Sequence, residues 1–155
     1  MKAIYQNPTN DERKLASLAH GSILVTFIIS VFSSGLATLL PLLIPMYIGW
    51  SHKDRSKYVT FHAWQAATFQ VSVMIFMLVL GTVLGIAWGV TTLLMPVLIG
   101  FLLLPVAIVL SVVIGITLFF TPLSGLAYGL IAAWEVYHHD NFRYRLIANW
   151  VENRL

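Results

Sequence analysis

Two long stretches of this 155-residue chain contain no Asp, Glu, Lys or Arg: Leu15 to Ser51, and Val59 to Trp134. A helix that spans a bilayer needs about 20 mainly apolar residues, so each stretch exceeds the length of a single crossing. Only 10% of the residues are charged, whereas soluble domains have about 25%. These features exclude a soluble fold. They predict an all-α membrane protein, because a helix satisfies its own backbone hydrogen bonds in hydrocarbon.

The charged residues form three clusters that flank the apolar stretches. Each cluster holds three basic residues: Lys2, Arg13 and Lys14 in the first, Lys53, Arg55 and Lys57 in the second, and Arg143, Arg145 and Arg154 in the third. Lys and Arg accumulate in cytoplasmic loops of membrane proteins, so we expect all three clusters in the cytoplasm. An even number of crossings then separates them. The chain is predicted to be a multi-pass protein of the inner (plasma) membrane with both termini cytoplasmic.

The first apolar stretch is interrupted once, by Ser33, Ser34 and Gly35. It predicts a helical hairpin over residues 15–50, either as two short spans or as one re-entrant hairpin, and we prefer two spans. A cytoplasmic N-terminus, residues 1–14, precedes the hairpin. A basic cytoplasmic loop, residues 51–58, follows it.

The second apolar stretch predicts two long transmembrane helices over residues 59–137. The first of them is expected to run from about His62 to Gly89 and to end in a polar bend at residues 88–92. The returning segment is too long for one span, so we expect it to be broken or kinked at prolines. The candidate positions are Pro96, Pro105 and Pro122. The predicted fold is thus a single membrane domain, residues 1–155, with four transmembrane helices; a five-span arrangement of residues 93–120 is the alternative.

Both ends of the chain carry helix signals. Thr9 followed by Glu12 is a capping-box pattern, which predicts that a helix starts there and enters the membrane at Ala16. The tail, residues 138–155, contains apolar residues at helical spacing that predict an interfacial C-terminal helix attracted to anionic lipid. These apolar residues are Phe142, Leu146, Ile147, Trp150 and Val151.

All five histidines fall near the predicted cytoplasmic side, and two of them lie inside apolar stretches. We expect His20 and His62 to lie close together near the head-group level, where partly desolvated imidazoles need hydrogen-bond partners. Gln65, one turn after His62, is expected to bond either to a histidine or to a backbone carbonyl. One interpretation makes His20, His62 and Gln65 a cofactor-binding or lipid-binding site. The preferred interpretation is structural, with no metal and no cofactor.

Small residues recur every four positions on both long helices. Gly81, Gly85 and Gly89 form one such face, and Gly125, Gly129 and Ala133 form the other. Such motifs are typical of close helix crossings. The two faces are expected to pack on each other within the monomer or, as the alternative, to form a homo-oligomer. A third face, Gln65, Thr68 and Ser72, either lines a cavity or bonds to a neighbouring helix, and we prefer the second option.

Several functional classes lack support in the sequence. No phosphate-binding loop, HExxH motif, nucleophile elbow or pair of carboxylates is present, so we expect no enzyme and no catalytic residues. Basic residues occur only beside the apolar stretches, so no nucleic-acid partner is expected. The chain contains no cysteine, which excludes disulfides and thiolate metal sites.

Several blocks in order along the chain resemble a known family. They are Glu12-Arg13-Lys14-Leu15-Ala16, Leu18-Ala19-His20, Phe61-His62-Ala63-Trp64-Gln65-Ala66, Phe69-Gln70, Ala132-Ala133 and Phe142-Arg143-Tyr144. With them the chain resembles a family of small prokaryotic membrane proteins of unknown function. That family is similar to the twenty-kilodalton membrane subunit of the chloroplast inner-envelope import translocon. This chain differs from the family at Thr68, where the family usually has Asn.

The resemblance implies a four-helix membrane architecture without an established activity. The leading hypothesis is a channel-like or scaffold component, in protein translocation or in the assembly of membrane complexes. The alternative is a cofactor-binding or lipid-binding membrane subunit that uses interfacial histidines. The expected partners are the lipid bilayer and either other membrane proteins or further copies of the chain.

Overall fold

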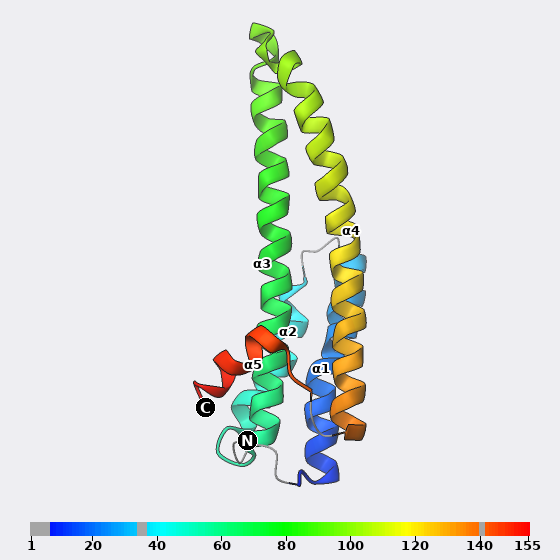
Figure 1. Ribbon diagram of the computed structural model, residues 1–155, viewed down its shortest axis with the longest axis vertical. Helices are drawn as coiled ribbons and strands as arrows, with labels where there is room; N and C mark the ends of the chain where they lie inside the picture. The colour runs from blue at the N-terminus through cyan, green and yellow to red at the C-terminus, as the bar shows by residue number, and fades with distance from the viewer. Residues whose placement is uncertain (1–6, 34–36, 140–141) are drawn as a thin grey trace. The chain divides into compact units, whose positions relative to one another are not determined.

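A computed structural model describes residues 7–33, 37–139 and 142–155 (Figure 1). Over these residues the regular structure consists of α-helices and one 3₁₀ turn: α1 (Asn10–Phe32), α2 (Leu39–His52), α3 (Lys57–Leu93), η2 (Met95–Val97), α4 (Ile99–His139) and α5 (Arg145–Glu152). The predicted all-α class is confirmed. The chain divides into two compact units. The first combines the described residues up to Ser72 with those from Gly125 onward, and the second is Val73–Ser124.

Three helices among the described residues are long and apolar enough to span a membrane, namely α1, α3 and α4. Helix α2 has 14 residues, which is fewer than the roughly 20 that a full crossing requires. The fourth transmembrane helix of the sequence prediction is therefore not confirmed. The predicted interruption before α2 falls mainly on Ser34 and Gly35, which lie outside the described residues.

Helix α1 begins as the sequence predicts. The Thr9 side chain accepts a hydrogen bond from the Glu12 backbone N–H at 3.3 Å, and the Glu12 carboxylate accepts one from the Thr9 N–H at 2.8 Å. This reciprocal pair satisfies donors that the first turn of a helix leaves free. The predicted capping box is confirmed.

The charged ends of the helices in the first unit lie together. Ser56, in the connection between α2 and α3, donates a hydrogen bond to the Glu12 carboxylate of α1 at 2.5 Å. The hydroxyl of Tyr58, at the start of α3, donates to the carbonyl of Val136, near the end of α4, at 3.4 Å. The start of α1, the end of α2, the start of α3 and the end of α4 therefore meet at one end of this unit (Figure 1).

In the second unit, α3 ends later than the sequence predicts. Helix α3 does not bend at residues 88–92 but continues to Leu93. The hydroxyls of Thr91 and Thr92 each donate to the carbonyl four residues earlier, at 2.8 Å, so these polar side chains are satisfied inside the helix. The turn lies just beyond, at Leu94 to Leu98, where Leu98 has a φ of 66°.

The tightness of this turn depends on Gly100. A Cβ atom at this position would lie 2.3 Å from the carbonyl oxygen of Thr91 and 2.5 Å from the backbone nitrogen of Met95. Both distances are far below van der Waals contact, so only glycine allows the start of α4 to pass so close to the end of α3.

Helix α4 also differs from its prediction. The segment was expected to be broken or kinked at prolines, whereas Ile99–His139 forms one unbroken helix of 41 residues that includes Pro105 and Pro122. The predicted kinks are not confirmed. Pro96 lies in the turn η2 before it. A proline removes one helical hydrogen bond, but in an apolar environment the remaining backbone groups find no better partners than those within the helix. The helix therefore continues through both prolines.

The two predicted glycine faces have different surroundings. Gly81, Gly85 and Gly89 are exposed, and a Cβ atom at any of them would meet no atom within 4 Å, so their role in packing stays a prediction. Gly125 and Gly129 are buried. A Cβ atom at Gly129 would lie 2.7 Å from Cγ2 of Ile23 on α1. The close approach at Gly129 is thus made to α1.

We expect Gly129→Val to destabilise the protein by about 1–3 kcal/mol, because the new side chain overlaps the stiff, β-branched Ile23. The control is Gly85→Ala, whose added methyl group meets no neighbour and improves helix propensity. The measurement is thermal unfolding of the purified protein in detergent. Equal melting temperatures for the two variants would show that Gly129 does not hold α1 and α4 together.

Candidate functional site

Small side chains bring α1 and α3 close together in the first unit. Ala19 of α1 and Ala63 and Ala66 of α3 form a buried cluster, against which Ile48 of α2 packs. Alanine at such positions lets helix backbones approach each other closely, as small residues do in membrane helices. This approach places the neighbouring polar side chains His20 and His62 within hydrogen-bonding distance.

His20 and His62, the histidine pair, meet at the centre of this contact. The exposed fraction is 1% for His20 and 0% for His62, and the distance from His20 Nε2 to His62 Nδ1 is 3.3 Å. The expected proximity of the two residues is therefore confirmed. His20 Nδ1 lies 3.3 Å from the hydroxyl oxygen of Tyr144, so the three side chains form a continuous polar chain.

Each of these two hydrogen bonds needs one proton between its two atoms. The position of the proton on one histidine therefore fixes its position on the other and decides whether the Tyr144 hydroxyl donates or accepts. If Tyr144 donates to His20 Nδ1, then His20 Nε2 donates to His62 Nδ1, and His62 carries its proton on Nε2. In the reverse direction His62 Nε2 is a free acceptor. Within the described part of the chain, His62 Nε2 is buried and has no hydrogen-bond partner. The chain of hydrogen bonds therefore ends at this nitrogen.

Tyr144 is held in place by aromatic neighbours. Its ring stacks on that of Phe69 at a centroid distance of 4.4 Å with an interplanar angle of 7°, and Tyr128 lies 5.4 Å away. Burial, with the nearby Tyr128, raises the pKa of the Tyr144 hydroxyl above its ordinary value. Tyr144 is therefore a neutral hydroxyl that can donate or accept a hydrogen bond.

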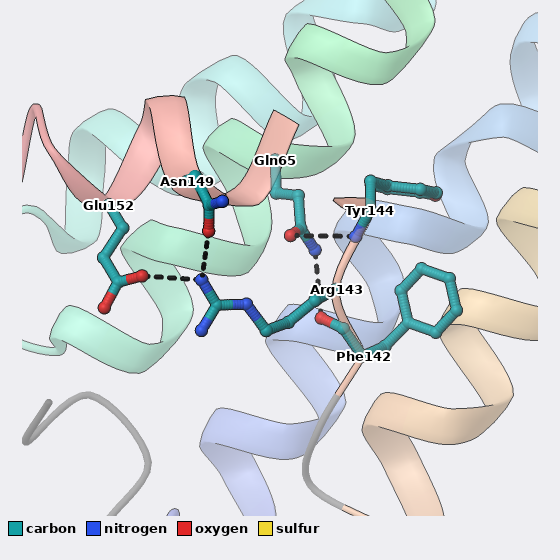
Figure 2. Close-up of polar contacts among 6 residues, drawn as sticks. All are labelled: Gln65, Phe142, Arg143, Tyr144, Asn149 and Glu152. Atoms are coloured by element: carbon teal, nitrogen blue, oxygen red, sulfur yellow. Dashed lines mark hydrogen bonds and ion pairs between the residues drawn. The ribbon is translucent and has the colours of Figure 1, made fainter. Parts of the chain in front are cut away.

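Gln65 fixes the backbone of the tail beside the histidine pair (Figure 2). Its amide nitrogen donates to the carbonyl of Phe142 at 3.1 Å, and its amide oxygen accepts from the backbone N–H of Tyr144 at 3.3 Å. We call this pair of bonds the tail clamp. Of the two partners predicted for Gln65, the backbone carbonyl is the one observed. Because Gln65 is fully buried, the clamp satisfies both backbone groups where water is absent.

Arg143 fastens the tail from its other side. Its guanidinium lies 2.6 Å from the Glu152 carboxylate and 3.1 Å from the Asn149 side-chain oxygen (Figure 2). The same guanidinium lies 5.8 Å from the centre of the Phe61 ring on α3. Helix α5 buries Ala148 and Val151 against Phe61. The tail is thus attached to α3 by the clamp, by this charged group and by apolar packing.

The other polar residues of α3 are used separately. Gln70 donates to the Ser22 hydroxyl at 2.9 Å and accepts from the Thr26 hydroxyl at 3.0 Å, both on α1. Ser72 is exposed and donates to the carbonyl of Thr68 in its own helix at 2.8 Å. The preferred option, in which Gln65, Thr68 and Ser72 together bond to a neighbouring helix, is therefore wrong for Ser72, whose bond lies within α3, whereas Gln65 bonds to the tail.

Sequence reasoning missed two parts of this site. It assigned no role to Tyr144, whose two hydrogen-bond partners, Gln65 and His20, lie 79 or more positions earlier in the sequence. It also overlooked the small residues of α1 and α3, although Ala16, Ala19, Ala63 and Ala66 recur at helical spacing. That spacing was the available signal for the contact between α1 and α3.

The fold and this site define an integral membrane protein, in which a buried polar cluster joins apolar helices. The chain belongs to the magnetosome magnetite crystal formation protein family (MamF/MmsF), whose model matches residues 11–151. No curated protein and no solved structure matches the chain.

This family membership corrects the resemblance described above. The chain was expected to be similar to the chloroplast import-translocon subunit and its prokaryotic relatives, whereas the family that matches nearly the whole chain is the magnetosome family. The expected similarity is wrong. The sequence blocks that suggested the resemblance contain His20, His62 and Gln65. In the structure these residues hold the helices and the tail together.

We expect Gln65→Leu to release the tail. The substitution leaves the Phe142 carbonyl and the Tyr144 N–H buried without partners, at a cost of about 1–3 kcal/mol for each unsatisfied group. Trypsin should then cleave the tail at Arg143 and Arg145 faster than in the parent protein. The control is Ser72→Ala, which removes only a bond within one helix. Unchanged cleavage after Gln65→Leu would show that the clamp does not hold the tail.

Proposed function

We propose that this protein is a non-enzymatic scaffold of the magnetosome membrane that takes part in magnetite crystal formation. The observation that carries the proposal is the match of residues 11–151 to the family of that description. The structure supports a scaffold role, because each of the buried polar side chains His20, Gln65 and Gln70 bonds to a different helix or to the tail and so joins two segments. A channel or a translocation role has no support from these contacts.

The polar contacts at this site hold segments together rather than prepare a reaction. Gln65 and Gln70 each use both ends of the amide to join separate segments. Ser17 likewise donates to the carbonyl of Ala133, joining α1 to α4 at 2.8 Å. Four segments of the first unit are thus fixed in one arrangement. A fixed membrane platform of this kind is suited to holding partner proteins or the membrane surface next to a growing crystal.

Removal of this protein from a cell that forms magnetite should change the size or shape of the crystals, while membrane compartments still form. Electron microscopy of the cells measures both. The parent chain and Ser72→Ala should restore the crystals, whereas Gln65→Leu should restore them less completely. Unchanged crystals after removal would contradict the proposal.

The alternative function, a cofactor-binding membrane subunit, is favoured by one observation. His62 Nε2 is a buried imidazole nitrogen without a partner in the described residues, and such a nitrogen can bind haem iron. A Soret band in the purified protein that disappears in His62→Ala would support this alternative and count against the scaffold role.

We also propose that the three charged clusters lie on the cytoplasmic side of the membrane. The contacts Ser56–Glu12 and Tyr58–Val136 support a common side for all three, and the excess of Lys and Arg supports the cytoplasm. Helices α3 and α4 then make one pair of crossings. The hairpin of α1 and α2 either crosses twice or re-enters, and both cases return the chain to the side it left.

Because the chain has no cysteine, single cysteines can test this topology. In a host cell that carries the chain in its plasma membrane, cysteines introduced as Lys53→Cys and Arg154→Cys should escape an impermeant thiol reagent in intact cells and react after the membrane is permeabilised. Labelling of one position alone in intact cells would show an odd number of crossings between them. Labelling of both would place the common side outside the cytoplasm.

A further inference from the structure

Helix α5 has three distinct sides. One side is buried on α3, through Ala148 and Val151. A second side is polar and carries Arg145, Asn149 and Glu152. The third side is apolar and exposed: the exposed fraction is 91% for Leu146 and 52% for Trp150. These two residues are four positions apart, so they lie on the same face of the helix.

The exposed apolar side lies at a defined place in the first unit. Helix α5 packs on Phe61, in the second turn of α3. The charged connection at residues 53–56 directly precedes α3, and Val59 begins the apolar stretch. A segment attached at this point is level with the boundary between charged loop and apolar span. In a membrane protein that boundary is the head-group layer, where tryptophan is enriched.

The charges around α5 are mainly positive. Arg143 is paired with Glu152 at 2.6 Å, which leaves Arg145 and Arg154 as the remaining charged residues of this segment. Both are exposed. The Arg154 guanidinium lies 4.8 Å from the centre of the Trp150 ring. This cation–π contact ties a positive charge to the edge of the exposed apolar side.

We propose that α5 lies in the head-group layer of the bilayer that holds the long helices and binds anionic phospholipids there. Leu146 and Trp150 face the acyl chains, and Arg145 and Arg154 bind lipid phosphates. An amphipathic helix with basic residues next to a tryptophan is the form of segment that lies in this layer. The tail clamp holds α5 in register with α3. The inference rests on the membrane location of the chain and not on its role in crystal formation.

The full chain, reconstituted in nanodiscs, allows a direct test. A single cysteine is introduced as Leu146→Cys or, for the polar side, as Asn149→Cys, and is labelled with an environment-sensitive fluorophore. The nanodiscs contain phosphatidylcholine alone or phosphatidylcholine with phosphatidylglycerol. Acrylamide, which is neutral and is not repelled by the lipid charge, serves as the quencher.

The label at position 146 should emit at shorter wavelength and be quenched at least severalfold less than the label at position 149. The difference should increase when phosphatidylglycerol is present. Adding Arg145→Gln and Arg154→Gln should remove the effect of phosphatidylglycerol, since each basic residue contributes about fivefold to binding at an anionic surface.

Three results would overturn the proposal. Equal quenching at positions 146 and 149 would place α5 in water. Protection at position 146 that is the same in both lipids would show lipid contact without recognition of anionic head groups. Protection that persists in detergent and falls on dilution would show that a second copy of the chain covers this side.

Discussion

The close approach of α1 and α3 determines the remaining contacts of the first unit. Ala19, Ala63 and Ala66 leave room for the two backbones to come together, and only at this separation can His20 and His62 share a hydrogen bond. A buried polar group without a partner costs free energy comparable to that of a lost hydrogen bond. The histidine pair therefore selects one register of α1 on α3. Tyr144 and Gln65 then attach the tail to that register.

This arrangement joins segments that are distant in the sequence. The hydrophobic effect places the long helices in the bilayer. It does not determine how each helix is rotated about its axis, because lipid is as apolar as the helix faces. Directional contacts make that choice: Gln70 with Ser22 and Thr26, Ser17 with the carbonyl of Ala133, and Gly129 with Ile23. Helix α5 extends the same unit by packing on Phe61 of α3. The proposed scaffold role needs this fixed geometry, because a partner or a lipid surface must be presented in one orientation.

Features encoded by local patterns could be predicted from the sequence. The capping box at Thr9 is one, and so is the all-α class. The proximity of His20 to His62 followed instead from the predicted topology, which places both residues at the same end of their helices. The other contacts between distant residues could not be predicted. Nothing near Tyr144 indicates that it bonds to His20, and nothing near Thr91 indicates that the helix continues past it. The prolines of α4 were misleading for a physical reason: a proline weakens a helix locally, but it ends one only where other partners for the backbone exist.

The central claim is that His20, His62 and Tyr144 form one buried contact that joins α1, α3 and the tail. Nuclear magnetic resonance of the full chain, with histidine and tyrosine selectively labelled, tests it most directly. The centre of the His20 ring lies 5.5 Å from the centre of the His62 ring and 5.6 Å from the centre of the Tyr144 ring. We expect cross-peaks between the ring protons of His20 and both partners, each lost in His20→Ala. Contacts of these rings with water or lipid, without cross-peaks between them, would contradict the account.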